Sequence, residues 1–390
     1  YKRQGIQNFE QLRNRNCVYV DKTELVYRLA NTDSVYFLSR PRRFGKSLLV
    51  STLEAYFQGK KDLFKGLAME RLEKDWNVYP VFHIDFSLTK YTTLFDLQEQ
   101  LNLFLLRCEK VYGAEKEEKT PAARLQGMIR RAYEQTGLPV VVLIDEYDVP
   151  MAKAHENGYY DEMVLLLRNM FGNVLKTNSS LAFAVLTGCL RIAKESIFTG
   201  LNNFKVYSIT NTEFDETFGF TDEEVKTMLH DYEMDDRYDE VKEWYDGYRF
   251  GKADVYCPWD VVNYCNDHIH NPEAEPENYW MNTSGNNVMN RFIDSVQQPD
   301  MLTKAELGWL VNGETVVKKI DETVTYDDLY STMDHLWSTL FMTGYLTQKG
   351  KEVDGRYCLA IPNQEIKNIV TERILTLFRN DVRKDGRAVL

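Results

Sequence analysis

Residues 39–47 read Ser-Arg-Pro-Arg-Arg-Phe-Gly-Lys-Ser and end with a glycine, a lysine and a hydroxyl in consecutive positions. They follow the apolar run 35–38, which is typical of a buried strand, and precede a helical pattern over residues 46–57. A strand–loop–helix of this kind offers backbone N–H groups and a helix N-terminus to a phosphate. In such a loop Lys46 reaches the β and γ oxygens and Ser47 holds Mg²⁺. The segment therefore predicts a P-loop that binds ATP and Mg²⁺.

Position 40 departs from the usual P-loop pattern G-x-x-x-x-G-K-[ST], which would place its first glycine there. Arg40 occupies that position, and an arginine disfavours a positive φ, so the loop must begin differently. On this segment alone, a helix that starts after a basic loop remains the alternative to a phosphate site.

Two adjacent acids, Asp145 and Glu146, follow the most apolar stretch of the chain, residues 140–144. Burying charge at the tip of a strand is costly unless a metal or a partner compensates it. In P-loop ATPases of the additional-strand class, the first acid orients Mg²⁺ through water and the second polarises the attacking water. We therefore predict that Asp145 serves the metal and Glu146 activates water, with a surface turn after a core strand as the alternative.

A further apolar strand, residues 181–186, leads into Thr187 and then Arg191. A polar side chain at the tip of the strand beside the acidic one can sense the γ-phosphate, which makes Thr187 the candidate. For Arg191 two interpretations stay open, an arginine finger acting in cis or an ordinary surface side chain.

Strands and helices alternate through the first half of the chain, and continuous apolar strands separated by helices are typical of a parallel sheet covered on both faces. The predicted fold class is α/β, a P-loop NTPase parallel sheet of about five strands with flanking helices. We expect strands at about 35–38, 81–86, 140–144, 181–186 and 205–209, and helices at 46–57, 94–111, 122–136 and 161–175.

After about residue 214 the pattern changes. Thr221 and Glu224 have capping-box spacing ahead of a short helix, and further helices are expected over 236–245 and from Pro258. These helices predict a lid.

The last third of the chain combines a helix over 326–341, a hairpin that turns near residue 354, and a final helix from about Asn363. This order suggests a winged-helix-like module. The predicted domains are a P-loop ATPase core at 1–215, a helical lid at 216–300, and a winged-helix-like or connector module at 301–390.

The chain has 390 residues, with 47 basic and 59 acidic side chains and a formal net charge of −12. Generic binding to DNA or RNA needs a basic surface, so this balance argues against it without excluding one basic patch. Six widely spaced cysteines fit reduced thiols better than a disulfide scaffold, which predicts a cytoplasmic protein. No apolar run approaches the roughly 18 residues that span a bilayer, so no membrane is expected.

Several segments of this chain together resemble one family. They are RPRRFGKS, VLIDEYD, LTGCLRIAKESIFTGLNNF, WYDGYRFG with VYCPWDV, YWMNTSG, and the leader GIQNFEQLRNRNCVYVDKT. Over nearly its whole length the chain is similar to the AAA-ATPase-like proteins that are common in Bacteroidetes and clostridia. The usual P-loop of that family is RPRRFGKS, which accounts for Arg40.

The resemblance implies an ASCE-type P-loop ATPase core related to the AAA and STAND groups. Together with the patterns above, it assigns Glu146 and Arg191 to catalysis and Ser47 and Asp145 to Mg²⁺. The leader residues Phe9, Tyr19 and Asp21–Thr23 would border the adenine. The residues assigned to nucleotide binding are Arg40, Arg42, Arg43, Phe44, Gly45, Lys46, Ser47, Leu48 and Thr187.

Many members of the family carry a C-terminal PD-(D/E)XK nuclease-like domain. This chain begins without Met and ends without a recognisable stop signal, so we expect a fragment in which such a domain would lie beyond Leu390. Glu365 and Lys367 match half of the nuclease motif, but the motif needs a strand and they stand at an expected helix start. We do not assign them to it. The spacing of Cys257 and Cys265 likewise does not fit a structural zinc site.

The predicted function is an ATP-binding and Mg²⁺-dependent ATP-hydrolysing switch or motor that regulates an attached or partner effector. Two alternatives stay open: a nucleotide-binding regulatory module with little turnover, and a nucleic-acid-handling protein that acts with a nuclease domain. The sequence leaves open whether the chain forms homo-oligomers, and whether a nuclease-like effector domain or a nucleic acid is its partner.

Overall fold

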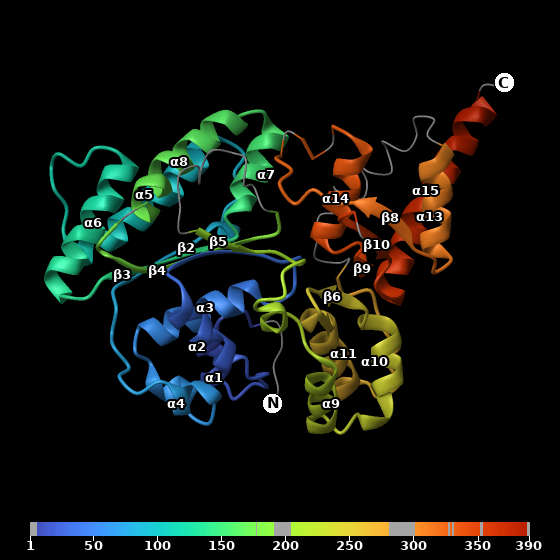
Figure 1. Cartoon of the computed structure of the whole chain (residues 1–390), viewed down its shortest axis with the longest axis horizontal. Helices are drawn as coiled ribbons and strands as arrows, with labels where there is room; N and C mark the ends of the chain where they lie inside the picture. Colours follow the sequence, from blue (N-terminus) through green and yellow to red (C-terminus); the bar gives the residue numbers. More distant parts are fainter. Residues whose placement is uncertain are drawn as a thin grey trace. The chain divides into compact units, whose positions relative to one another are not determined.

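The computed structural model describes residues 6–176, 178–190, 204–280, 301–326, 328–329, 331–351 and 354–387. The chain divides into two compact units (Figure 1). The first comprises residues 1–40, 45–217 and 323–327, and the second comprises residues 41–44, 218–322 and 328–390. Residues 41–44 therefore belong to the second unit, although the residues on both sides of them belong to the first.

The first unit is built on a five-stranded sheet with the order β2-β3-β4-β1-β5, in which every neighbouring pair is parallel (Figure 1). The predicted α/β fold with a parallel sheet of about five strands is confirmed, and each strand lies within a few residues of its expected place. The bounds are Val35–Ser39 for β1, Val81–Asp85 for β2, Val140–Asp145 for β3, Leu181–Gly188 for β4 and Phe204–Tyr207 for β5.

The order of the strands separates the P-loop strand β1 from the acid-bearing strand β3, because β4 lies between them. Ser39 pairs with Gly188 across β1 and β4, and Ile144 pairs with Leu186 across β3 and β4. This is the additional-strand arrangement that the family resemblance implies. Since the strands are parallel, their carboxyl ends meet at one edge of the sheet, where ligands bind in open α/β folds.

Helices cover both faces of this sheet (Figure 1). All five residues of β1 and all six of β3 are buried, which explains why these strands read as continuous apolar runs. On one face lie α1 Phe9–Asn14, α2 Thr23–Thr32, α3 Lys46–Phe57 and α4 Ala68–Leu72; on the other lie α5 Leu94–Tyr112, α6 Pro121–Thr136, α7 Asp148–Asn157 and α8 Tyr160–Leu175.

The leader before β1 packs on α3. The Phe9 N–H donates to Ser51 Oγ at 2.9 Å, and the Phe9 ring lies 5.2 Å from the Tyr19 ring and 4.9 Å from that of Phe64. Asp21 Oδ1 accepts the backbone N–H of Thr23 at 2.9 Å. Through these contacts the leader residues pack within the first unit. That Phe9, Tyr19 and Asp21–Thr23 border an adenine stays a prediction.

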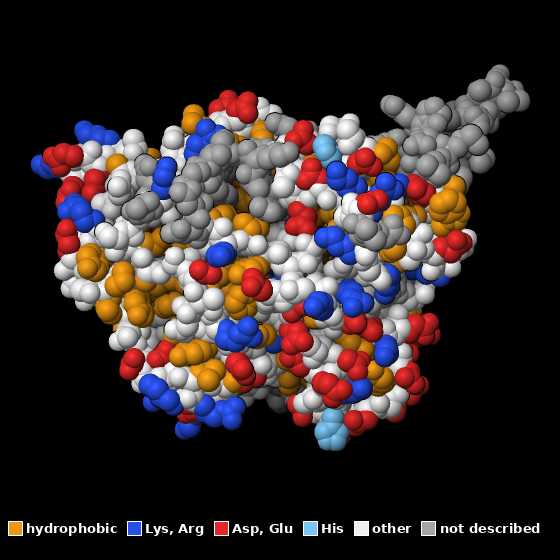
Figure 2. All heavy atoms as spheres, in the orientation of Figure 1, with side chains coloured by type: hydrophobic (Ala, Val, Ile, Leu, Met, Phe, Trp, Pro, Cys, Tyr) orange, Lys and Arg blue, Asp and Glu red, His pale blue; other side chains and the backbone are white. Residues whose placement is uncertain are grey.

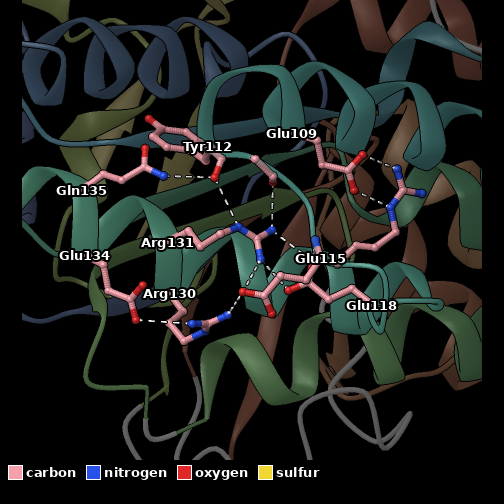
Figure 3. Close-up of polar contacts among 10 residues, drawn as sticks. Glu109, Tyr112, Glu115, Glu118, Arg130, Arg131, Glu134 and Gln135 are labelled. Atoms are coloured by element: carbon pink, nitrogen blue, oxygen red, sulfur yellow. Dashed lines mark hydrogen bonds and ion pairs between the residues drawn. The ribbon is translucent and has the colours of Figure 1, made fainter.

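A network of ion pairs fastens the loop between α5 and α6 (Figure 3). Arg131 Nη1 is 2.6 Å from Glu118 Oε1, and Arg131 Nη2 donates to the carbonyl of Gly113 at 2.9 Å. A Cβ placed on Gly127 would lie 1.6 Å from Glu118 Oε1. A side chain at position 127 would therefore displace the Glu118 carboxylate from its present place.

The second unit begins with a helical part. Helices α9 Asp222–Asp231, α10 Tyr238–Tyr245 and α11 Pro258–His270 accompany a hairpin of β6 Tyr248–Phe250 and β7 Ala253–Val255. Thr221 and Glu224 form a capping box at the start of α9, as their spacing predicts.

The second unit also holds a three-stranded antiparallel sheet with the order β8-β10-β9, formed by Val316–Lys319, Arg356–Ala360 and Thr347–Lys351. The hairpin of β9 and β10 turns where the sequence predicts, whereas β8 was not expected. The described residues of this part also form α13 Met301–Val311, α14 Met333–Thr343 and α15 Gln364–Arg387.

Helix α14 starts seven residues later than the pattern from residue 326 predicts. The Thr332 side chain accepts the backbone N–H of His335, so Thr332 is the N-cap. The winged-helix-like interpretation and the limits 216–300 and 301–390 stay predictions.

Acidic side chains gather over α9 and α10 in the space-filling view (Figure 2). An acidic surface repels the phosphates of a nucleic acid, so these two helices do not offer a generic DNA or RNA surface. Among the described residues, no helix is long and apolar enough to cross a membrane. The exposed acids of this part are Glu223, Asp231, Glu233, Asp235, Asp236, Asp239 and Glu243.

Candidate functional site

Helix α3 begins immediately after Gly45, which is its N-cap and has a left-handed backbone with φ +86°. A side chain is strained in this conformation, and glycine adopts it freely. Gly45 is exposed, and no atom lies within 4 Å of the place where a Cβ would stand. The first N–H groups of α3, at Lys46, Ser47 and the half-buried Leu48, form an accessible helix N-terminus.

Lys46 is 3% exposed, and its ammonium faces three groups of the first unit. Lys46 Nζ is 3.3 Å from Glu146 Oε1, donates to the carbonyl of Arg40 at 3.1 Å, and lies 3.5 Å from Cys189 Sγ. The structure thus joins the predicted phosphate-binding lysine to the predicted water-activating acid.

The electrostatic surroundings keep Lys46 charged. Burial by itself lowers the pKa of Lys46, but Cys189 and the acids Glu146, Asp148 and Asp145 outweigh it, so the pKa is raised. A permanently cationic, buried ammonium is suited to binding an anion that enters beside it.

Asp145 is 2% exposed and ends β3. Burial and then the charge of Glu146 raise its pKa, while hydrogen bonds from Ser47 and Thr187 lower it. The Thr187 hydroxyl donates to Asp145 Oδ1, and the same oxygen of Thr187 accepts the Glu146 backbone N–H at 3.2 Å. Thr187 therefore orients both acids at once.

Glu146 has a positive φ of 52°, which is uncommon for a residue with a side chain. Such strain persists where the surroundings hold it, and it is frequent at functional sites. Its backbone is held by Thr187 and its carboxylate by Lys46.

Arg40 is completely buried, and its guanidinium holds backbone carbonyls within the first unit. Nη1 donates to Ser39 at 2.8 Å and to Tyr207 at 3.1 Å, and Nη2 donates to Phe214 at 3.3 Å. These bonds tie the end of β1 to the end of β5 and to the segment that follows β5. The structure thus assigns Arg40 a role in holding the loop, and direct nucleotide contact by Arg40 stays untested.

Arg42, Arg43 and Phe44 lie in the second unit. Arg42 is exposed, whereas the Arg43 guanidinium lies 4.3 Å from the ring centre of Trp259. Phe44 is 1% exposed, with its ring 4.9 Å from those of Tyr248 and of Phe250. Arg191 lies outside the described residues.

Sequence reasoning missed Asp148 and Gly188. Asp148 is 4% exposed, and its Oδ2 accepts the N–H groups of Cys189 at 2.8 Å and Leu190 at 3.2 Å. Both residues are part of the quoted segments VLIDEYD and LTGC. The signal was a third acid, two residues after Glu146, at the start of a helix.

Two histidines and Glu365 have local partners. His83, half-buried in β2, has its Nδ1 2.9 Å from Glu54 Oε2. Glu365 is buried in the first turn of α15 and accepts the N–H of Trp280 at 2.6 Å. His268 Nδ1 lies 2.9 Å from the carbonyl of Tyr264. None of these placements brings a ligand set together.

The residues present fit a phosphate group and Mg²⁺. An open helix N-terminus at Gly45, a buried cation at Lys46, and the hydrogen-bonded oxygens of Ser47 and Asp145 are the donors these groups require. A carboxylate, Glu146, already occupies the anion-binding face of Lys46.

Residues 3–198 match the family model described as AAA-ATPase-like, predicted AAA-ATPase. A protein of Azotobacter chroococcum mcd 1, described as an uncharacterized protein in the vnfD 5′ region, is 29% identical over 392 residues. The match spans 96% of this chain and 70% of that protein.

Among solved structures, a Walker-type ATPase of Pyrococcus abyssi overlaps with a TM-score of 0.42 at 15% identity, over 95% of this chain and 97% of that one. The ORC2 protein of Aeropyrum pernix overlaps with a TM-score of 0.37 at 11% identity, over 94% and 97% of the two chains. These overlaps are weak. The family match is the firmer finding, and with residues 3–198 of its 390 residues matched, this chain belongs to the predicted AAA-ATPase family.

Proposed function

We propose that this chain binds ATP with Mg²⁺ and hydrolyses it, as a nucleotide-dependent switch that controls an attached or partner effector. The observation that supports the proposal is the 3.3 Å ion pair between Lys46 Nζ and Glu146 Oε1. The pair joins the lysine that we propose binds phosphate to the acid that we propose activates water, and Asp145 accepts a hydrogen bond from Ser47 beside them.

Each group has a distinct role in this proposal. The N–H groups at the start of α3 and the Lys46 ammonium bind the phosphates, since a helix N-terminus favours anions. Ser47 and Asp145 hold Mg²⁺, which supplies positive charge to the phosphoryl oxygens. Glu146 orients the attacking water and accepts its proton. Thr187 keeps both acids oriented.

In this proposal the ion pair acts as a gate. Oε1 of Glu146 lies 3.3 Å from Lys46 Nζ, so this oxygen is held by the ammonium. A phosphate that binds Lys46 competes with Glu146 and releases its carboxylate. The base thus becomes available when the substrate is in place, which limits its action on other molecules.

An arginine that neutralises charge at the γ-phosphate completes the proposed site. Arg42, Arg43 and Arg191 are the candidates. We leave Arg40 out, because its guanidinium donates to three carbonyls inside the first unit. Single alanine substitutions of the three candidates, assayed for turnover and nucleotide binding, identify the one that lowers turnover alone.

Two substitutions test the proposal. Lys46→Ala is expected to abolish ATP binding measured by calorimetry, whereas Glu146→Gln is expected to bind ATP without releasing phosphate. Lys60 and Glu10 form an exposed ion pair of 2.6 Å, so Lys60→Ala and Glu10→Gln are matched controls. A Glu146→Gln protein with the wild-type turnover rate would refute the mechanism. Nucleotide binding by the wild type without turnover would favour a binding module instead.

A further inference from the structure

Asp148 is a buried acid that the proposed reaction does not use. It is the first residue of α7, and its Oδ2 accepts the N–H groups of Cys189 at 2.8 Å and Leu190 at 3.2 Å. These are the first two residues after β4. One carboxylate oxygen therefore fixes the direction in which the chain leaves the strand that carries Thr187.

Gly188 makes this approach possible. A Cβ at position 188 would lie 2.9 Å from Asp148 Oδ1 and 2.8 Å from Tyr147 Cε1. Tyr147 adds two bonds of its own: its N–H donates to the Thr187 carbonyl at 3.0 Å and its hydroxyl to the Leu190 carbonyl at 3.1 Å. Residues 145–148 and 187–190 thus form one hydrogen-bonded clamp, which we call the acid–tip clamp.

The acid–tip clamp determines what faces the P-loop. Cys189 Sγ lies 3.5 Å from Lys46 Nζ, and the Cys189 carbonyl accepts the Ser39 hydroxyl at 2.8 Å. The Gly188 carbonyl accepts the Arg40 N–H at 3.1 Å. A shift of the β4 tip would therefore move groups that contact both ends of the P-loop.

One oxygen of Asp148 is left over. Oδ1 is buried, and no group of the described residues forms a hydrogen bond with it. Leaving a buried acceptor unsatisfied carries the desolvation cost of that group. Asp148 keeps this cost while its other oxygen holds two backbone N–H groups, so fixing the tip of β4 is what the buried side chain contributes.

We infer that Asp148 is a positioning residue for ATP hydrolysis, whose carboxylate holds the backbone of Cys189 and Leu190 so that Thr187 and Cys189 keep their places beside Asp145 and Lys46. The inference rests on the proposed function. Asp148 acts through these neighbours and touches no substrate, so its loss changes turnover more than nucleotide binding.

Asp148→Ala and Asp148→Asn test the inference in the full chain. Asparagine offers an amide oxygen in the place of Oδ2, so it can still accept both N–H groups. We expect Asp148→Ala to lower kcat about 30-fold with KM for ATP within about threefold, and Asp148→Asn to keep kcat within about fivefold of wild type. Asp161→Ala, at an exposed position in the first turn of α8, is the control.

A second measurement separates this inference from the proposed function. In hydrogen–deuterium exchange without nucleotide, Asp148→Ala is expected to speed exchange at the amides of Cys189 and Leu190, and Asp148→Asn to leave it at the wild-type level. Wild-type protein without ATP turnover would remove the proposed function, but the exchange result would still decide whether Asp148 holds the strand tip.

Three results would overturn the inference. They are unchanged exchange in Asp148→Ala, a loss in Asp148→Asn as large as that in Asp148→Ala, or a rise of KM with kcat unchanged. If Asp148→Ala melts below the assay temperature, Gly188→Ala provides the second variant, because its Cβ displaces the carboxylate without removing it. The same selective loss of kcat is expected for Gly188→Ala, and a loss of nucleotide binding alone would contradict the inference.

Discussion

Asp85 at the end of β2 and Asp145 at the end of β3 are direct partners in the parallel register of the sheet. After burial and Glu146, the charge of Asp85 is one of the causes that raise the pKa of Asp145. Two neighbouring carboxylates at this edge attract a divalent cation and disfavour the ionised form of each other.

We predict that Asp85→Asn weakens the Mg²⁺ dependence of ATP hydrolysis. Removing one negative charge beside Asp145, the proposed Mg²⁺ ligand, is expected to raise the Mg²⁺ concentration for half-maximal rate roughly three- to tenfold. The rate at saturating Mg²⁺ should be nearly unchanged. Asparagine can still accept the Ser87 N–H that Asp85 Oδ1 accepts at 2.8 Å, so the local turn is kept. Asp75→Asn, at an exposed position, is the control. An unchanged Mg²⁺ titration would show that Asp85 does not act on the metal.

Glu146→Gln is expected to bind nucleotide more tightly than the wild type. The glutamine has no charge to hold Lys46, so a phosphate no longer competes with a carboxylate for the ammonium. Removing this competition makes the binding free energy of the nucleotide more favourable by about 1 kcal/mol. This corresponds to a dissociation constant roughly fivefold lower for ADP or ATP. Calorimetric titration measures it. Equal or weaker binding would mean that the resting pair does not gate Lys46.

Gly188→Ala is expected to destabilise the first unit by about 2 kcal/mol, since its Cβ meets Tyr147 and Asp148 at contact distances that real structures do not show. Combining it with Asp148→Ala should cost less than the two single changes together, because the second change removes one of the two obstacles. Gly308 lies exposed in α13 with nothing within 4 Å of an added Cβ, so Gly308→Ala is the matched control. Strict additivity in chemical denaturation would contradict the acid–tip clamp.

Gly127→Ala is expected to break the ion-pair network of Figure 3. The new Cβ would stand 1.6 Å from Glu118 Oε1, so the Glu118 carboxylate must shift from its present place beside Arg131. Loss of a partly buried, bidentate pair costs about 1–3 kcal/mol. In the double variant Gly127→Ala/Glu118→Ala, most of this loss should already be present in the Glu118→Ala parent. Chemical denaturation of the three variants measures their free energies of unfolding. A Gly127→Ala protein as stable as the wild type would show that the network does not stabilise the fold.

Stability of the second unit is expected to fall as pH rises from about 5 to 7. Burial raises the pKa of Asp260 to about 7, although hydrogen bonds with Cys257 and Glu365 and the charge of Arg43 lower it. In this window the folded state keeps a proton that the unfolded state has released, so rising pH favours unfolding by about 2 kcal/mol.

Asp260→Asn cannot release that proton, so its melting temperature should change less over the same pH range. Asp239→Asn, an exposed acid of α10, should keep the wild-type slope. If Asp260→Asn and wild type lose stability in parallel, another group is responsible.

The features that the sequence predicts well are local. Helix α3 runs from Lys46 to Phe57 as its pattern indicates, and the Thr221–Glu224 capping box starts α9 as its spacing requires. The parallel sheet predicts that the strand ends meet at one edge, and Lys46 and Glu146 do lie together there, although the ion pair itself was not predicted.

Features that depend on distant partners were not predictable. Helix α7 contains Pro150 in its first turn and few large apolar residues, so periodicity did not reveal it. Strand β8 becomes a strand by pairing with β10, which the local sequence does not show. Arg40 can be buried because the carbonyls of Tyr207 and Phe214 accept its hydrogen bonds, and both lie more than 160 residues away in the chain.

Residues 41–44 limit how the two units can be recombined between related genes. A chain that stops at residue 217 would keep the sheet and most of the proposed catalytic groups, but Phe44 would lose Tyr248 and Phe250, and Arg43 would lose Trp259. A single crossover at residue 217 therefore cannot exchange the second unit between genes as a complete piece. A hybrid with the second unit of a relative must bring a compatible Pro41–Phe44 with it, so the P-loop tip and the WYDGYRFG and VYCPWDV segments should change together over evolution.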